Sequence, residues 1–107
     1  MLKFNQESGW SFENELRCFI IFKRLELVDF PRGMQSDLCH VLADSTTLSF
    51  SSVSAKVGNY KSEMGVNNPS HSSEATKYIV KSFGLMSLLE LEALLTGYLI
   101  GKSENYA

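Results

Sequence analysis

The leucine-rich stretch at residues 87–100 constrains the fold more than any other part of this sequence. One helical stripe carries Leu88, Leu91, Leu95 and Tyr98, and further apolar residues cover much of the remaining circumference. A helix that is apolar on more than one side lies in the centre of a core or is shared with a second subunit. Both arrangements stay open from the sequence. The second predicts a homodimer or partner interface through these four residues.

Polar residues within the same stretch define its start and argue against a membrane span. Ser87 and Glu90 have the three-residue spacing of a capping box, which predicts that the helix begins at Ser87. Glu90 and Glu92 interrupt an apolar run that is already too short to cross a bilayer. Because the N-terminus also lacks the apolar segment of a signal peptide, we expect a cytoplasmic protein without membrane contact.

Apolar residues recur at three- and four-residue spacing in four earlier segments. Pro31, Gly33 and the turn-forming residues 67–69 separate these segments. The sequence therefore predicts an all-α, compact five-helix domain, with helices at about residues 11–26, 35–43, 51–64, 72–83 and 87–100. An extended strand at residues 46–53 is the alternative to the start of the third helix.

The length of 107 residues fits a single domain. We divide it into a leading arm at residues 1–9, a helix-turn-helix-like trio at residues 10–65 and two C-terminal helices at residues 72–100. The last residues, 101–107, are expected to fray.

Side chains that could catalyse a reaction or hold a metal do not gather into a pattern. Glu13 and Glu15 lie two apart in a predicted helix and face different directions, and Cys39 and His40 are adjacent and point apart. There is no CxxC motif and no zinc-site spacing of histidines, and both cysteines are expected to be buried, reduced thiols. We therefore predict a protein that is not an enzyme and uses no metal, cofactor or small-molecule substrate.

The predicted helix at residues 51–64 carries the polar residues best suited to contact DNA. Phosphates are bound by lysine and arginine, and base edges by asparagine, serine and arginine. The candidate DNA contacts are Ser54, Lys56, Asn59, Lys61 and Arg32. A solvated helix face would have the same composition, and the net charge of −2 does not favour a nucleic-acid binder.

The other side of this helix is apolar and is expected to face the core through Val53, Val57 and Tyr60. Ser51 or Ser52 is the expected N-cap. Glycine within a helix costs about 1 kcal/mol relative to alanine, so Gly58 predicts that another backbone packs closely there.

Two short motifs resemble a known domain. Residues 10–16 (WSFENEL) are similar to its W-[ST]-x-E-x-E-L opening, and residues 52–61 (SVSAKVGNYK) are similar to its S-V-x-x-K-x-x-N-[FY] element. The domain is a small helical, Myb- or helix-turn-helix-like domain found ahead of HNH nuclease domains in bacterial restriction-type proteins. The resemblance covers residues 10–83.

The resemblance implies a DNA-facing helix that carries Lys56, Asn59 and Lys61, with Trp10 in the core. No His-Asn-His nuclease portion follows the domain in this sequence. We therefore expect a stand-alone module without cleavage activity, of the kind carried by mobile genetic elements such as phages or integron cassettes.

Two functional hypotheses follow from the sequence. The leading one is a non-enzymatic DNA-binding module, able to dimerise, that places its third helix over a groove. The alternative is a protein-interaction or adaptor domain that docks through the leucine-rich C-terminal helix.

Overall fold

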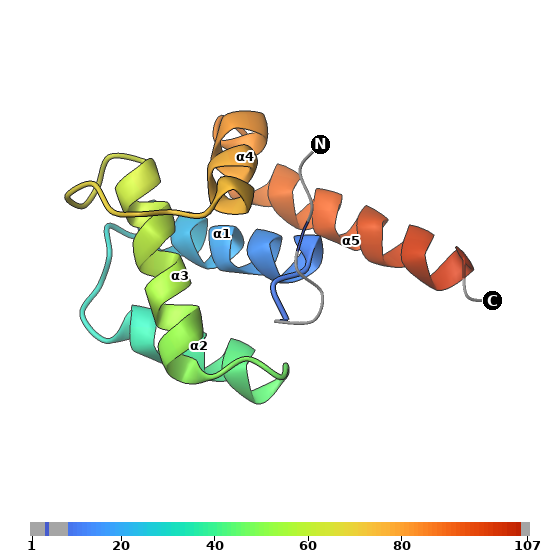
Figure 1. The fold of residues 1–107 in the computed structure, drawn as a ribbon, viewed down its shortest axis with the longest axis horizontal. Helices are drawn as coiled ribbons and strands as arrows, with labels where there is room; N and C mark the ends of the chain where they lie inside the picture. The colour runs from blue at the N-terminus through green and yellow to red at the C-terminus, as the bar shows by residue number, and fades with distance from the viewer. Residues whose placement is uncertain (1–3, 5–8, 106–107) are drawn as a thin grey trace.

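The computed structural model describes residue 4 and residues 9–105. Within them the chain forms five α-helices and no strand: α1 (Phe12–Leu27), α2 (Met34–Asp44), α3 (Phe50–Glu63), α4 (Glu74–Phe83) and α5 (Leu88–Asn105) (Figure 1). The predicted all-α, five-helix fold is confirmed. The alternative strand at residues 46–53 is wrong, because these residues form bends and then the first turn of α3.

α1 is the central helix of the fold. Eight of its sixteen residues are buried, and it contacts each of the other four helices. Its N-cap is Ser11, whose Oγ accepts a hydrogen bond from the Asn14 backbone N–H at 3.2 Å. α2 and α3 pack together against α1, and α4 rests on α1 and α3. The interior of the molecule is therefore built around one helix that is buried on most sides.

α5 lies antiparallel to α1 and extends away from the other helices (Figure 1). An Arg24–Glu92 ion pair of 2.6 Å joins the two helices near one end, and a Lys102–Glu13 ion pair joins them near the other. α5 continues to Asn105, so residues 101–105, which were expected to fray, are helical in this structure. Residues 106–107 lie outside the described residues.

The core confirms the inward stripe predicted for α3 and the burial of the cysteines. Cys18 and Cys39 are fully buried free thiols. The buried apolar residues are Leu16, Cys18, Phe19, Ile20, Ile21, Phe22, Leu25, Cys39, Leu42, Leu48, Val53, Val57, Tyr60, Ile79 and Leu91.

The start and the glycine of α3 differ from expectation. The N-cap is Ser49 rather than Ser51 or Ser52, and its Oγ accepts a hydrogen bond from the Ser52 backbone N–H at 3.1 Å. No other element among the described residues packs on Gly58: outside its own helical turns, a Cβ added there would meet none of their atoms within 4 Å. The prediction of a close helix crossing at Gly58 is therefore wrong.

The predicted leading arm is described only at Phe4 and Gly9. The Phe4 ring lies edge-on to Phe12, with centroids 5.5 Å apart, and 6.3 Å from Tyr78. This residue therefore docks over the seam between α1 and α4.

Candidate functional site

A network of four polar side chains lies in the core where α1, α3 and α4 meet. Glu15 Oε2 accepts a hydrogen bond from Lys56 Nζ at 3.0 Å. Its Oε1 accepts hydrogen bonds from the Tyr60 hydroxyl at 2.6 Å and from Thr76 Oγ1 at 3.2 Å. Lys56 Nζ also donates to Thr76 Oγ1 at 3.2 Å. Both oxygens of the carboxylate are thus occupied by protein donors, which is what a buried charge requires.

Burial and an aromatic ring complete this environment. Glu15 is 1% exposed and Lys56 is 8% exposed, and the lysine ammonium lies 4.5 Å from the centroid of the Trp10 ring, in a cation–π arrangement. Burial, and then the neighbouring Glu15 carboxylate, raise the pKa of the Tyr60 hydroxyl, so Tyr60 keeps its proton and remains a donor. The network is closed and acts as a structural joint between three helices.

The prediction that Lys56 contacts DNA phosphates is wrong in this fold. Its ammonium is held by Glu15 and Thr76 and covered by Trp10, so it is not presented to a ligand. A signal for this was present in the sequence, because Lys56 falls on the same helical stripe as Val53, Val57 and Tyr60.

The other candidate DNA contacts lie at or near the surface but do not form one cluster of free side chains. Ser54 is half-buried, and Arg32 is exposed in the connection between α1 and α2. The Asn59 side-chain oxygen accepts a hydrogen bond from Ser70 Oγ at 3.2 Å. Lys61 Nζ donates to Gln35 Oε1 at 3.2 Å and lies 5.4 Å from the Phe30 ring centroid.

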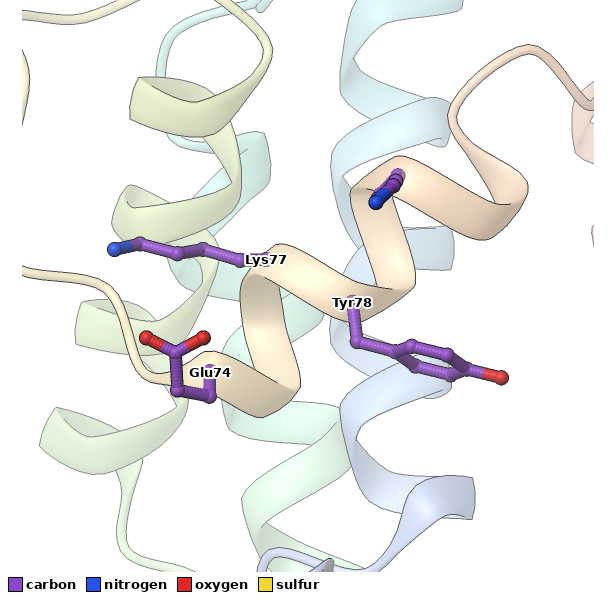
Figure 2. A pocket seen from close by; sticks show the side chains of 4 residues that line it. Glu74, Lys77 and Tyr78 are labelled. Carbon is purple, nitrogen blue, oxygen red and sulfur yellow. The ribbon is translucent and has the colours of Figure 1, made fainter. Parts of the chain in front are cut away.

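Two further lysines stand on α4. Lys77 and Lys81 line a shallow surface hollow of about 250 Å³ together with Glu74 and Tyr78 (Figure 2). Figure 2 shows Lys77 and Tyr78 projecting to opposite sides of α4. Both lysines are exposed, and neither forms an ion pair with a carboxylate in the part of the chain that the structure describes.

The residues predicted as a partner interface on α5 face α1 instead. Leu91 is fully buried, Leu88 and Leu95 are half-buried against the core, and the Tyr98 ring lies 4.9 Å from the Phe12 ring. The fold therefore shows the first of the two arrangements left open for this stripe, in which Leu88, Leu91, Leu95 and Tyr98 pack on the core of their own chain. A homodimer or partner interface through these four residues stays a prediction.

The opposite side of α5 is exposed and apolar. We define the outer face of α5 as Leu89, Ala93, Thr96, Gly97 and Ile100, all of which are exposed. Leu89 and Ile100 expose 77% and 54% of their surface, and Leu85, in the turn before α5, is fully exposed. No charged residue interrupts this face for three turns.

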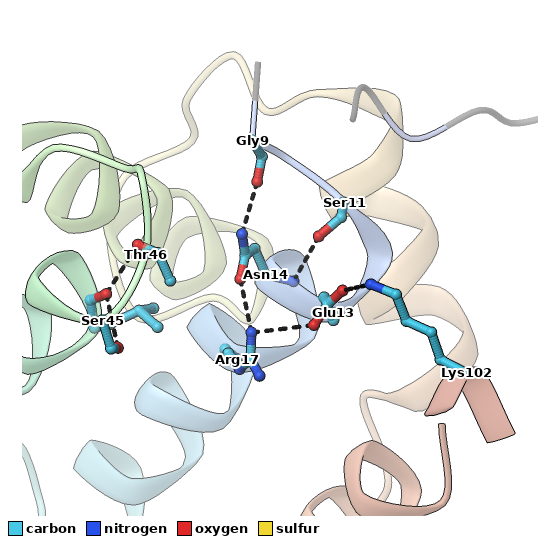
Figure 3. Close-up of polar contacts among 9 residues, drawn as sticks. Gly9, Ser11, Glu13, Asn14, Arg17, Ser45, Thr46 and Lys102 are labelled. Atoms are coloured by element: carbon cyan, nitrogen blue, oxygen red, sulfur yellow. Dashed lines mark hydrogen bonds and ion pairs between the residues drawn. The ribbon is translucent and has the colours of Figure 1, made fainter. Parts of the chain in front are cut away.

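Polar contacts at the start of α1 fix the far end of α5 (Figure 3). Glu13 accepts hydrogen bonds from Lys102 and, at 3.3 Å, from Arg17. Arg17 also donates to the Asn14 side-chain oxygen at 3.0 Å, and Asn14 Nδ2 donates to the Gly9 carbonyl at 2.8 Å. Glu13 therefore belongs to a surface network, separate from the buried network of Glu15.

An apolar hollow of about 270 Å³ lies between α1, α2 and α5. Its lining includes Ile20, Ile21 and Leu95, together with the two arginines Arg17 and Arg24. Both arginines are already paired, with Glu13 and with Glu92 respectively.

The residues considered for catalysis do not come together. Burial raises the pKa of the Cys39 thiol, and burial followed by the nearby Glu15 raises that of Cys18, so both remain protonated. The His40 ring is stacked on the Phe50 ring, with the two ring centroids 3.9 Å apart. Among residues 4 and 9–105, no three His, Cys, Asp or Glu side chains gather as a metal site.

Among residues 4 and 9–105, no single helix is long and apolar enough to cross a membrane. α4 and α5 have the required length and apolar character only when taken together, and they are bent by 117° relative to each other.

Comparison with known protein families, with curated proteins and with solved structures found no match. The resemblance to the HNH-associated domain therefore stays a prediction.

The motifs that carry this resemblance map onto the buried network. Trp10 and Glu15 belong to the first motif, and Lys56 and Tyr60 to the second. All four meet in one place in the core, where they hold α1 against α3. Their spacing is thus explained by packing in the core.

Proposed function

We propose that this chain is a protein-binding domain and that the outer face of α5 is its binding surface. The observation that carries the proposal is the uncharged and largely apolar surface from Leu89 to Ile100 on a helix that is supported from behind by α1. Exposed apolar faces of this kind mark interaction sites in monomeric proteins more often than single scattered residues do.

The energetics favour a partner on this face. Burying a leucine or isoleucine side chain contributes about 1.5–3 kcal/mol, and Leu89 and Ile100 still expose most of their surface. The ion pairs Arg24–Glu92 and Lys102–Glu13 hold α5 in place on α1. Binding would therefore need little ordering of the helix, which lowers its entropic cost.

Site-specific photo-crosslinking in the producing cells tests the proposal. A benzophenone amino acid at position 89 or 96 should give discrete covalent adducts on irradiation. The same group at Ser82, an exposed polar position on α4, serves as the matched control and should give none. Adducts that form equally from position 82, or from no position, would contradict a binding surface on α5.

DNA contact through α4 and the adjoining end of α3 is the second candidate. Its support is the pair of exposed lysines, Lys77 and Lys81, one turn apart on α4, with Lys61 on α3. Glu74 in the same hollow and Glu63 at the end of α3 weaken the positive field.

Fluorescence anisotropy with a mixed-sequence duplex at about 50 mM salt tests this candidate and separates it from the first. Non-specific protein–DNA complexes have dissociation constants of about 1–100 μM. A Lys77→Ala/Lys81→Ala double variant should weaken binding several-fold and reduce the salt slope by about 2. Lys102→Ala, at the far end of α5, is the control and should leave the affinity unchanged. Absence of binding at about 100 μM protein would rule out this candidate.

A further inference from the structure

We infer that the partner of the outer face of α5 is a second copy of this chain, with the two α5 helices antiparallel. This inference rests on the proposed function and adds the identity of the partner. It follows from the order of residues along the face, from the position of the charges beside it and from the free space above its centre.

Four of the five residues of the outer face pair about one midpoint, and the position related to the fifth, Gly97, is Glu92. Two large residues, Leu89 and Ile100, lie at equal distances from a midpoint between Leu94 and Leu95, and Ala93 and Thr96 lie at equal distances inside them. A two-fold axis at this midpoint brings Leu89 opposite Ile100 of the second copy, and Ala93 opposite Thr96. Such a self-complementary patch is what an isologous dimer requires.

The small residues in the middle allow the two helices to approach closely. Outside its own helical turns, a Cβ placed on Gly97 would meet no atom of the described residues within 4 Å, so the space above it is open to a second helix. Ala93 and Thr96 are also short. Helices that cross at small residues reach the lower end of the usual 8–10 Å interaxial range, and the large residues can then pack on either side.

Three charged side chains of α5 that the structure describes are compatible with this arrangement. Glu92 is paired with Arg24, Lys102 with Glu13, and Glu90 accepts a hydrogen bond from the Ser87 backbone N–H at 2.8 Å. The dimer therefore does not bury one of these side chains without a partner.

Antiparallel packing also separates the two Glu90 side chains. It displaces them by nine residues, which is about 13.5 Å along the helix at 1.5 Å per residue. This exceeds the Debye length of about 8 Å at physiological ionic strength. A parallel pair would place each Glu90 beside its copy and would align the two helix dipoles unfavourably.

The expected dimer is weak. Four side chains and one glycine on one helix bury less than the area of about 1,200 Å² at the lower limit of stable complexes. We therefore expect a dissociation constant between about 10 μM and 1 mM. Equilibrium sedimentation at protein concentrations between about 5 μM and 500 μM should show the average mass rising from that of the monomer toward that of the dimer.

Ala93→Glu and Ala55→Glu form a matched pair of variants. Both alanines are exposed in helices, Ala93 on the outer face of α5 and Ala55 on α3, so neither change should unfold the protein. Ala93→Glu should weaken dimerisation at least tenfold, and Ala55→Glu should leave it unchanged. Equal effects of the two variants, or a wild type that stays monomeric at the highest concentration, would overturn the inference.

Engineered cysteines test the direction of packing. Because Cys18 and Cys39 are fully buried, Leu89→Cys and Ile100→Cys variants should be the reactive species under mild oxidation. Antiparallel packing predicts that a mixture of the two variants forms mainly the mixed disulfide. A preference for the Leu89→Cys homodisulfide would indicate parallel packing and would overturn the inference.

The crosslinking experiment distinguishes this inference from the proposed function. Adducts of twice the chain mass from positions 89 and 96 support both. Adducts of another mass, combined with a monomer in sedimentation, overturn the second copy as partner and keep α5 as a binding surface. A monomer without adducts overturns both.

Discussion

At the residue scale, Lys56 is the most informative side chain. The sequence offers a lysine beside serines and an asparagine, which is the composition of a DNA-reading helix. In the fold it is paired with Glu15 and covered by Trp10. Its neighbours on the inward stripe could have shown its burial, but its partner lies 41 residues away and no local pattern reveals it.

Lys56→Met should lower the free energy of unfolding by about 3 kcal/mol, because it leaves the Glu15 charge buried without its cation. Urea unfolding followed by circular dichroism measures this change. Lys77→Met, an exposed lysine on α4, is the control and should change stability by less than about 0.5 kcal/mol. Equal stability of the two variants would show that the buried pair contributes little.

Glycines provide a second residue-scale prediction. Gly58 lies inside α3 with open space around it, so Gly58→Ala should raise the free energy of unfolding by about 1 kcal/mol. Gly65 follows the same helix with a φ of +82°, which favours glycine, so Gly65→Ala should lower it by about 1 kcal/mol. Thermal or urea unfolding measures the change in stability of both variants. A loss of stability in Gly58→Ala would mean that another element contacts that side of α3.

At the element scale, helix existence was predictable, and so was the inward stripe of α3. The five helices follow from three- and four-residue periodicity, and the capping box of Ser87 and Glu90 forms as its spacing predicts. For α5 the sequence identified the most apolar stripe but could not decide whether that stripe packs on its own chain or on a second subunit, because apolar residues also cover the other sides of the helix. Only the packing on α1 decides that Leu91 is buried while Leu89 is exposed.

The capping box predicts a pH effect on α5. The hydrogen bond from the Ser87 backbone N–H lowers the pKa of the exposed Glu90 carboxyl. Because the pKa is lower in the folded state, the ionised form stabilises the cap above the ordinary glutamate value of about 4.3. This contribution is lost as the pH falls through the lowered pKa.

An NMR titration of the Glu90 carboxyl carbon should give a lower midpoint in the folded protein than in urea. Glu90→Gln should remove the corresponding acid-dependent loss of helix in α5. At neutral pH the variant should differ little from the wild type in its helix content. An unshifted midpoint would contradict the capping box.

At the scale of the whole molecule, stability should decrease from α1 outward. α1 contacts all the other helices, whereas the buried core includes only Leu91 from α5. Native-state hydrogen exchange should therefore show the amides around Phe19 opening only with global unfolding. The amides of residues 101–105 should exchange through local opening, with rates at least tenfold faster.

Protein concentration extends this measurement to the proposed dimer. If α5 pairs with a second copy, protection near Ala93 and Gly97 should rise with concentration, while protection in α1 stays constant. Faster exchange in α1 than in α5 would contradict the central role of α1 in the fold.

The buried network also bears on ancestry. Its members contact one another through hydrogen bonds and a cation–π contact, so a change at one of them leaves others without a partner. They are Trp10, Glu15, Lys56, Tyr60 and Thr76. We expect descendants of a common ancestor to inherit the five as a set, or to exchange Glu15 and Lys56 together for apolar residues. Their spacing is therefore a signature for tracing distant relatives even where the surface, and with it the function, has diverged.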